Sequence, residues 1–182
     1  GISVTLAAPT GRAAQRMGSV AGLQARTIHR LLEFRPGSGG FSFNKSPGNQ
    51  LQTDVVILDE VSMVDITLMR HFLRALRDTT RLILVGDNNQ LPSVGPGNVL
   101  ADLIESGRIE HVHLTTLFRQ ASQSKIVRSA HDILQSRVPE FANRSEDNCF
   151  FIGTADPDHC LQTIVDLACR RIPKRYGLDP VN

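Results

Sequence analysis

The hydrophobic positions of this chain form short aliphatic runs separated by longer mixed segments. Two unbroken runs, at 55–58 and 82–85, have the aliphatic character of strands buried on both faces. Residues 3–8, at the start of the chain, predict a further strand, and Thr10 directly after it is the residue type that caps a helix. The chain therefore begins with a strand that enters a helix through a tight turn.

Apolar residues spaced three and four apart predict the helices. A second helix is expected to begin at Thr27, and others are predicted over 98–106, 125–136 and 158–171. The helix after the run at 55–58 is predicted to carry Met69, Phe72, Leu73 and Leu76 on one face, with Asp65 as its cap. Strands that alternate with helices predict an α/β fold with a doubly wound parallel sheet.

Other segments give weaker patterns. Residues 36–50 are rich in Gly, Ser, Pro and Asn, which predicts a long surface loop or a short hairpin. Short strands are predicted at 112–114 and 149–152, and Pro173 is expected to end the last helix. The change of character after Pro139 predicts two domains, 1–140 and 141–182.

Composition excludes several classes of protein. The chain has 182 residues, of which 41% are apolar and 21% are charged, as in an ordinary globular protein. Its apolar runs are far shorter than the roughly 20 residues that cross a bilayer, so no membrane partner is expected. The residues after Gly1 do not form a secretory signal. Three cysteines without a C-x-x-C pair suggest neither a disulfide framework nor a zinc site, which favours a reducing, cytoplasmic setting.

Charge is distributed unevenly along the chain. The first 50 residues hold six basic residues and one acidic residue, a net charge of +5, and the remainder carries −3. A basic stretch forms either a solvated face or a surface for a polyanion such as nucleic acid. Charge alone does not separate these two interpretations.

Polar residues follow three of the predicted strands. They are Thr10-Gly11-Arg12, Asp59-Glu60, and Gly86-Asp87 with Asn88-Asn89-Gln90 behind them. Ligands of open α/β sheets bind at the carboxyl ends of the strands. An apolar strand that ends in Asp59-Glu60 suits a magnesium nucleotide site, in which one carboxylate holds the metal and the other activates water. The alternative is a pair of solvent-facing acids where a strand reaches the surface.

Two further residues fit nucleotide hydrolysis. Gln90 is the residue type that senses a γ-phosphate, and the guanidinium of Arg119 can stabilise charge on a transferring phosphoryl group. No Gly-Lys pair of a phosphate-binding loop occurs in the chain. We therefore expect the chain to begin downstream of that loop, with the sheet truncated at its N-terminal strand.

Five segments of the chain, in order, form a recognisable set of motifs. They are Ala8-Pro-Thr-Gly-Arg-Ala-Ala14, Thr27-Ile-His-Arg-Leu-Leu32, Asp59-Glu-Val-Ser-Met-Val-Asp65, Val85-Gly-Asp-Asn-Asn-Gln-Leu-Pro-Ser-Val-Gly-Pro-Gly97 and Leu114-Thr-Thr-Leu-Phe-Arg-Gln120. Together they resemble the motifs of the RecD-like superfamily 1 DNA helicases, the family that includes the exodeoxyribonuclease V alpha subunit. The resemblance covers residues 3 to about 140, and the remainder is similar to the start of a second motor domain.

This resemblance implies a RecA-like domain of the P-loop NTPase type that uses ATP and Mg²⁺ to move 5′ to 3′ along single-stranded DNA in recombination and repair. It implies that Asp59 holds magnesium, Glu60 activates water, Gln90 contacts the γ-phosphate and Arg119 acts as an arginine finger. It also implies DNA contacts by Pro9, Thr10, Gly11, Arg12, Thr27 and His29, and other subunits of an exonuclease V-type complex as partners. Asn89 departs from the family pattern, which commonly has Asp there.

The chemistry of the residues at the start of the first helix is consistent with the DNA contacts that the resemblance implies. The amides at the start of the helix after Thr10 favour a phosphate, and Arg12 and Arg16 are expected to add positive charge there. Alternatives remain: a single-strand binding module without catalysis, a metal-dependent nuclease built on Asp59, Glu60 and Asp87, and a scaffold descended from a nucleotide-binding domain. Without the loop-bearing strand, the chain alone is expected to be inactive and to associate through the edge of the strand at 82–85.

Overall fold

The computed structural model describes residues 1–37, 40–114, 124–144 and 147–179. The chain divides into two compact units, 1–113 and 114–182, which are described separately below. The predicted boundary at residue 140 lies inside the second unit, and the division into motor domains stays a prediction.

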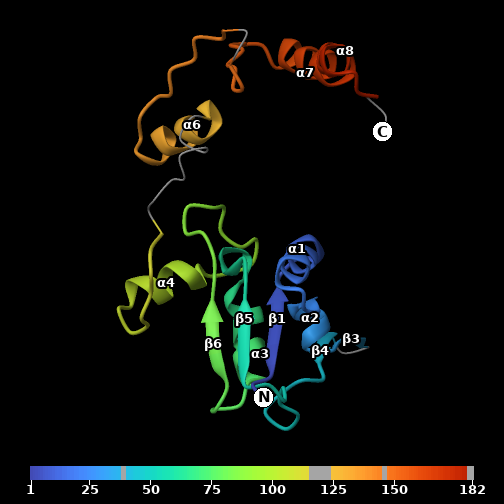
Figure 1. Ribbon diagram of the computed structural model, residues 1–182, viewed down its shortest axis with the longest axis vertical. Coiled ribbons are helices and arrows are strands. Elements are labelled where there is room, and N and C mark those ends of the chain that lie inside the picture. The colour runs from blue at the N-terminus through green and yellow to red at the C-terminus, as the bar shows by residue number, and fades with distance from the viewer. Residues whose placement is uncertain (38–39, 115–123, 145–146, 180–182) are drawn as a thin grey trace. The chain divides into compact units, whose positions relative to one another are not determined.

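The first unit is built on a parallel sheet of four strands in the order β2-β1-β5-β6 (Figure 1). The strands are β1 (Val4–Ala8), β2 (Ala25–Thr27), β5 (Val55–Leu58) and β6 (Arg81–Leu84). Leu6 of β1 pairs with Ile57 of β5, which pairs with Ile83 of β6. The predicted parallel sheet is therefore confirmed.

The helices of this unit begin where the sequence predicts. They are α1 (Gly11–Ala21), α2 (Ile28–Leu31), α3 (Ile66–Arg74) and α4 (Val99–Glu105), with a 3₁₀ turn η1 (Val61–Met63) before α3. The side chains of Thr10, Thr27 and Asp65 cap α1, α2 and α3, each accepting from the amide three residues on. These bonds satisfy amides that the helices cannot pair internally.

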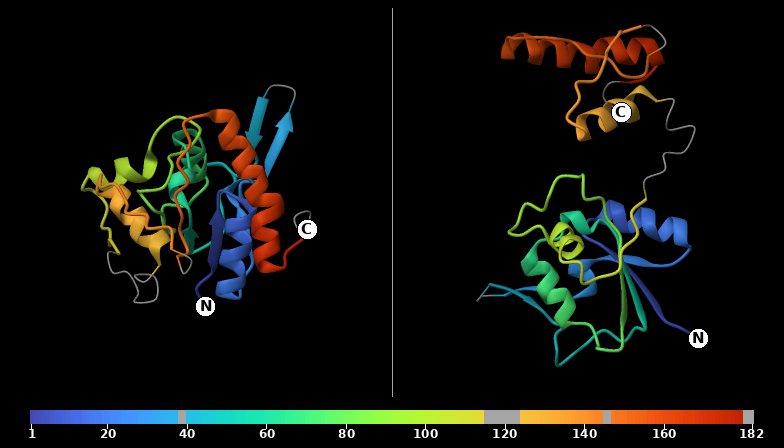
Figure 2. Two further views of the ribbon diagram at one scale, coloured as in Figure 1. Left: turned by 90° about the horizontal axis from the view of Figure 1, so that it is seen from above. Right: turned by 90° about the vertical axis from the view of Figure 1, so that its left-hand side faces the viewer.

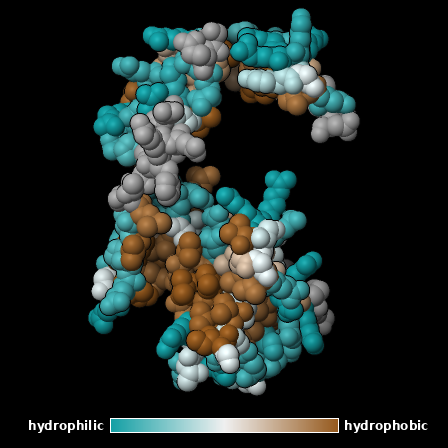
Figure 3. Space-filling model, viewed as in Figure 1, coloured by the Kyte–Doolittle hydropathy of each residue, from teal (hydrophilic) through white to brown (hydrophobic). Residues whose placement is uncertain are grey.

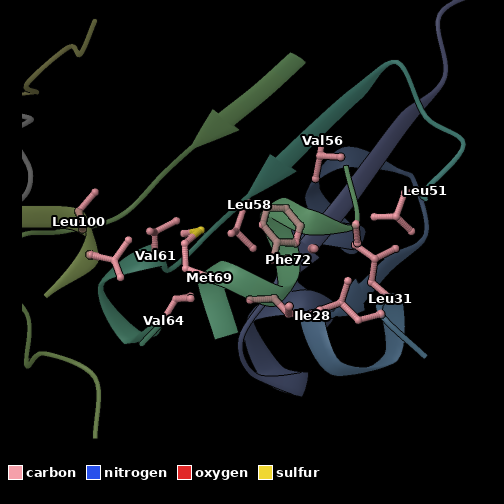
Figure 4. Close-up of a cluster of buried hydrophobic side chains, with 14 residues drawn as sticks. Ile28, Leu31, Leu51, Val56, Leu58, Val61, Val64, Met69, Phe72 and Leu100 are labelled. Atoms are coloured by element: carbon pink, nitrogen blue, oxygen red, sulfur yellow. The ribbon is translucent and has the colours of Figure 1, made fainter. Parts of the chain in front are cut away.

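One face of the sheet carries the hydrophobic core. Val56 and Leu58 of β5 are fully buried there against Phe72 of α3, and α2 contributes Ile28 to the same cluster (Figure 4). Met69 and Leu76 also pack in or against this core, as predicted. Leu73 does not: it is 48% exposed, because it lies on the outer side of α3.

The opposite face of the sheet is only partly covered. Helix α1 lies on it, on the other side of the sheet from α3 (Figure 2), and approaches Leu6 and Ile57. Ile83 shares this face by register but is 48% exposed, and Val85 just beyond β6 is 47% exposed. Figure 3 shows apolar side chains gathered over the strands. The prediction that 82–85 is buried on both faces is therefore wrong, since β6 is the last strand of the sheet and one of its faces is left exposed at Ile83.

A hairpin, β3 (Phe34–Gly37) and β4 (Gly40–Phe43), follows α2. The sequence predicted either a long surface loop or a short hairpin at 36–50, and the structure shows the hairpin. Rings of Phe34 and Phe43 lie 5.6 Å apart, and His29 lies 5.6 Å and 5.9 Å from the same two rings. The hairpin is thus joined to α2 by an aromatic cluster.

The second unit contains helices α6 (Lys125–Leu134), α7 (Pro157–Asp166) and α8 (Ile172–Tyr176), with a π-helical segment η2 (Leu167–Arg171) between the last two. Pro173 was predicted to end the last helix, and this prediction is wrong. Pro173 lies in the first turn of α8, where a missing N–H is tolerated.

The two short strands predicted at 112–114 and 149–152 are both absent from the described structure. At the second of them the side chain of Asn143 donates to the Phe151 carbonyl at 2.8 Å and accepts from its amide at 2.9 Å. A side chain therefore takes the place that a neighbouring strand would occupy. Val112 and Leu114 are almost fully exposed and likewise lack a strand partner in the described part of the chain.

Candidate functional site

The carboxyl edge of the sheet holds the Asp59-Glu60 pair between two neighbouring strands. The Asp59 amide donates to the Ala7 carbonyl at 3.0 Å, and the Val61 amide donates to the Val85 carbonyl at 3.0 Å. Backbone bonds on both sides therefore continue past the end of β5 and fix the residues that follow it. Asp59 and Glu60 are half-buried and lie next to each other at this edge.

Glu60 has an unusual backbone conformation. Its φ of 55° lies in the left-handed region, which costs a non-glycine residue on the order of 1 kcal/mol. The Asp59 carboxylate supports it by accepting from the Glu60 amide at 2.9 Å. This turn redirects the chain from β5 into η1, and residues held in such conformations cluster at functional sites.

Gly86 allows the next strand end to approach this turn. A Cβ at position 86 would lie 3.2 Å from the Val61 amide nitrogen, 3.3 Å from that of Ser62 and 2.8 Å from the Leu100 side chain. A side chain there would require the Leu100 side chain and the backbone of Val61 and Ser62 to move apart. The Gly86-Asp87 segment therefore lies directly against the backbone that follows Glu60.

Gln90 lies in an exposed turn after this glycine. The Asp87 carboxylate accepts from the Asn89 amide at 2.9 Å, and the Gln90 amide donates to the Asp87 carbonyl at 3.2 Å. No hydrogen bond joins the Gln90 side chain to Asp59 or Glu60 among the residues that the structure describes. The structure thus places Gln90 on the expected loop without a hydrogen bond from its side chain to either acid in the described residues.

The rest of this loop is attached to the start of α3. The Ile66 amide donates to the Pro96 carbonyl at 2.9 Å, and Ser93 donates to the carbonyls of Gly95 and Gly97. Gly95 lies so close to the Asp65 carboxylate that no side chain could be added there. Asp65 therefore caps α3 and also supports the loop that carries Gln90.

A hollow of about 450 Å³ opens beside the acidic pair, and we call it the Glu60 hollow. It is lined by Leu6, Ala13, Arg16, Met17, Val20, Ala21, Ile57, Asp59 and Glu60. Its walls are α1 and the partly covered face of β1 and β5. Arg16, which was predicted to add positive charge on the DNA side, lines this hollow together with the two carboxylates, and its part in DNA binding stays a prediction.

A second hollow of about 490 Å³, the Thr27 hollow, lies between α1 and the segment from β2 to α2. It is lined by Gly11, Ala14, Gln15, Gln24, Ala25, Arg26, Thr27 and Arg30. Its ionisable lining residues are two arginines, and the Arg26 guanidinium donates to the Gln24 carboxamide at 3.1 Å. A lining with two cations and no acid suits a phosphate.

The Thr27 hollow gathers some of the residues predicted to bind DNA. Gly11 and Thr27 line it, whereas Pro9, Thr10, Arg12 and His29 do not. His29 is exposed and packs edge-on against Phe34. The sequence reasoning missed Gln15, Gln24, Arg26 and Arg30 as lining residues, although the two arginines were part of the basic excess and flank Thr27. Arg119 lies outside the described residues.

The donor set at the sheet edge fits magnesium in one respect. Mg²⁺ in nucleotide sites is commonly held through one or two carboxylates together with phosphates and water. Asp59 and Glu60 supply such a pair. No cluster of three or more His, Cys, Asp or Glu residues that could hold a metal ion by itself occurs in the described ranges. The nuclease alternative requires Asp59, Glu60 and Asp87 to gather at one metal, which they do not do in the described structure.

Comparison with known proteins agrees with this geometry. Residues 1–154 match the family described as AAA domain. The chain belongs to this family. Membership in it implies the use of a nucleotide, usually together with Mg²⁺. No helix of the described residues is long and apolar enough to span a membrane.

Two relatives carry RecD-type names, and one of them is named as a DNA helicase. The ATP-dependent RecD2 DNA helicase of Deinococcus radiodurans is 39% identical over 144 residues, which make up 79% of this chain and 19% of that protein. The RecBCD enzyme subunit RecD of Mycolicibacterium smegmatis is 44% identical over 118 residues, 56% of this chain and 21% of that protein. These matches confirm the resemblance to the RecD-like superfamily 1 helicases. This AAA-domain chain spans about a fifth of the length of each.

A solved structure has the same fold. The Pif1 helicase from Bacteroides, crystallised with ADP-AlF3 and ssDNA, matches 95% of this chain and 42% of its own with a TM-score of 0.54 and 23% identity. The predicted RecA-like α/β fold is therefore confirmed for this AAA-domain chain.

Proposed function

We propose that this chain is part of an ATP-dependent DNA helicase that couples ATP hydrolysis to 5′ to 3′ movement on single-stranded DNA. One observation carries the proposal: the sheet presents an acidic pair and a hollow lined by two arginines on different sides of α1. A nucleotide hydrolase that tracks along DNA needs both kinds of surface on one domain. The name of the RecD2 relative, an ATP-dependent DNA helicase, supports the same activity.

At the acidic pair, Asp59 would hold Mg²⁺, which neutralises phosphate charge when it is bound. The neighbouring Glu60 would orient and deprotonate the attacking water, and its fixed left-handed turn holds its Cα in one place for that task. Gln90 would contact the γ-phosphate from its loop, and Arg119 would act as an arginine finger. These roles rest on the motif resemblance and on the placement of Asp59, Glu60 and Gln90 at the carboxyl edge of the sheet.

On the other side of α1, the DNA backbone would run past the start of α1 and the Thr27 hollow. Thr10, Gly11 and Arg12 at the start of α1, with Pro9 before them, would contact one phosphate through backbone amides and charge. Thr27 and His29 would contact the next. Arg26 and Arg30 extend this cationic surface, because both line the hollow that Thr27 shares with Gly11.

The wider setting is part of the same proposal. The M. smegmatis relative is named as a subunit of the RecBCD enzyme, which supports other subunits of an exonuclease V-type complex as partners. The role in DNA recombination and repair rests on the motif resemblance. The polarity of movement rests on the resemblance to RecD-like helicases. The cytoplasmic setting rests on the cysteine pattern, and the three cysteines form no disulfide.

The test is ATP hydrolysis by the full-length protein with and without single-stranded DNA, in wild type and in Glu60→Gln. Loss of the carboxylate that activates water should reduce DNA-stimulated turnover by at least about a hundredfold. The affinity for single-stranded DNA should remain unchanged, because Glu60 does not line the Thr27 hollow. Glu110→Gln, at an exposed acid outside both hollows, is the matched control and should retain full activity.

The leading alternative is a single-strand binding module without catalysis. It predicts salt-dependent DNA binding in both proteins and no hydrolysis in either. Wild-type protein that binds DNA tightly but releases no phosphate would therefore overturn the motor assignment.

A further inference from the structure

Helix α1 is the wall between the two hollows. Gly11, Ala14 and Gln15 line the Thr27 hollow, whereas Ala13, Arg16 and Met17 line the Glu60 hollow. Residues three and four apart lie on one side of a helix, so these two sets belong to different sides of α1. Adjacent residues, Gln15 and Arg16, therefore face different chemical environments.

Arg16 is the basic residue of the Glu60 hollow. No ion pair joins it to Asp59, Glu60 or any other acid in the described part of the chain, so its guanidinium is available for an anion that enters the hollow. The lining carries one formal positive charge and two negative charges. One bound Mg²⁺ would change the net formal charge of the hollow from −1 to +1, which is suited to phosphates.

The helix that carries Arg16 is held closely at both sides. Its first turn is capped by Thr10, and Gly18 approaches the segment before β2 so closely that an added Cβ would lie 2.9 Å from the Leu23 carbonyl. Gly11 and Arg16 are five residues apart, about 7.5 Å along the helix axis. Both residues belong to the one continuous helix α1. A shift of α1 caused by a phosphate in the Thr27 hollow would for this reason also move Arg16 relative to Glu60.

We propose that Arg16 is a positioning residue that couples DNA in the Thr27 hollow to hydrolysis at Glu60. The inference rests on the proposed function and adds to it a residue outside the contacts assigned to DNA and to water activation. Arg16 does not touch DNA in this scheme. It aligns the phosphates and Glu60 with each other only when α1 has taken the position set by DNA.

The experiment uses the full-length protein with a fluorescent oligo-dT strand, and it measures ATP hydrolysis without DNA, hydrolysis at saturating DNA, and DNA affinity by anisotropy. Arg16→Ala should lower the ratio of stimulated to unstimulated turnover by at least about fivefold, the lower end of typical coupling between two sites. Its DNA dissociation constant should stay within about twofold of wild type, well below the tenfold that corresponds to about 1.4 kcal/mol. Arg16→Lys retains the positive charge and should restore part of the ratio.

The neighbouring residue supplies the matched control. Gln15→Ala changes the side of α1 that faces the Thr27 hollow, so it should weaken DNA binding and leave the ratio at saturating DNA unchanged. Arg16 is exposed, so its replacement should not disturb the core. If thermal melting nevertheless shows that Arg16→Ala is unfolded, Arg16→Gln replaces it in the same measurements.

Three results would overturn the inference. In the first, Arg16→Ala raises the KM for ATP and leaves the ratio intact, which makes Arg16 a plain nucleotide contact. In the second, it weakens DNA binding as Gln15→Ala does, and in the third it changes nothing. A wild-type protein without DNA-stimulated hydrolysis would instead remove the proposed function itself, so the two failures are distinguishable.

Discussion

Gly86 shows how a single residue determines the geometry of the candidate nucleotide site. Its backbone lies against the amides of Val61 and Ser62, and the Leu100 side chain closes the remaining space. Leu100 is buried, so it has little room to move. Any side chain at position 86 must push apart the end of β6 and the turn that holds Glu60.

We predict that Gly86→Ala destabilises the chain by about 1–3 kcal/mol, the usual cost of overpacking a close contact. It should also reduce DNA-stimulated ATP hydrolysis in the full-length protein, because the turn at Glu60 must shift. Urea unfolding of residues 1–182 measures the first effect. Gly48→Ala is the control, since a Cβ there meets no atom within 4 Å. Equal stability of the two variants would contradict this account of Gly86.

At the scale of single residues, the sequence predicted what depends on neighbours in the chain. Thr10 and Asp65 were recognised as caps, and Thr27 as the start of a helix, because these signals need only the next few residues. The place of Arg16 in the lining of the Glu60 hollow was not predicted. It depends on how α1 sits on β1 and β2, and no local pattern encodes that placement.

At the scale of elements, β1 and β5 are joined at their first residues by a cluster around Asp54. The Ser3 amide and hydroxyl donate to the Asp54 carboxylate at 2.8 Å and 2.7 Å, and the Arg77 guanidinium lies 3.7 Å from it. The hydrogen bonds from Ser3, and then the charge of Arg77, lower the pKa of Asp54 below its ordinary value of 3.8. This cluster sets the register of the two strands that hold the candidate site.

A lowered pKa gives a stability contribution that is present above the unfolded-state value of 3.8 and is lost as the pH falls through the folded-state value. We predict that Asp54→Asn is less stable than wild type at pH 6 and that the difference shrinks below pH 3.8. Urea unfolding of residues 1–182 at several pH values measures it. Asp78→Asn is the control at an exposed acid without an ion pair in the described part of the chain. A difference that stays constant with pH would show that Asp54 acts through its shape alone.

The elements also show why parts of the fold could not be predicted. The strand at 55–58 was recognised because an unbroken aliphatic run is characteristic of a central strand. The segment at 149–152 is also an apolar run, with two phenylalanines, but Asn143 satisfies the backbone of Phe151 and no strand pairs with it in the described structure. Strand pairing depends on distant residues, which a local pattern does not contain.

At the scale of the whole molecule, the sheet of the first unit has one covered face and one partly covered face. Helices α2 and α3 bury the covered face. On the other face α1 leaves Ile83 of β6 exposed, and Val85 just after β6 is exposed as well. β6 is the last strand in the order of the sheet, so its outer backbone groups have no strand partner among the described residues. An exposed apolar edge strand is a site at which chains pair with each other.

We therefore predict that residues 1–182 self-associate in solution, and that Ile83→Lys shifts them toward the monomer because a charge on an edge strand opposes pairing. Sedimentation velocity over a range of concentrations measures the association. Thr79→Lys adds the same charge in an exposed turn outside β6 and should associate as wild type does. If Thr79→Lys disperses the chain equally, net charge is responsible and the face at Ile83 is not the contact. A wild-type chain that stays monomeric at high concentration would show that the exposed face of β6 does not pair.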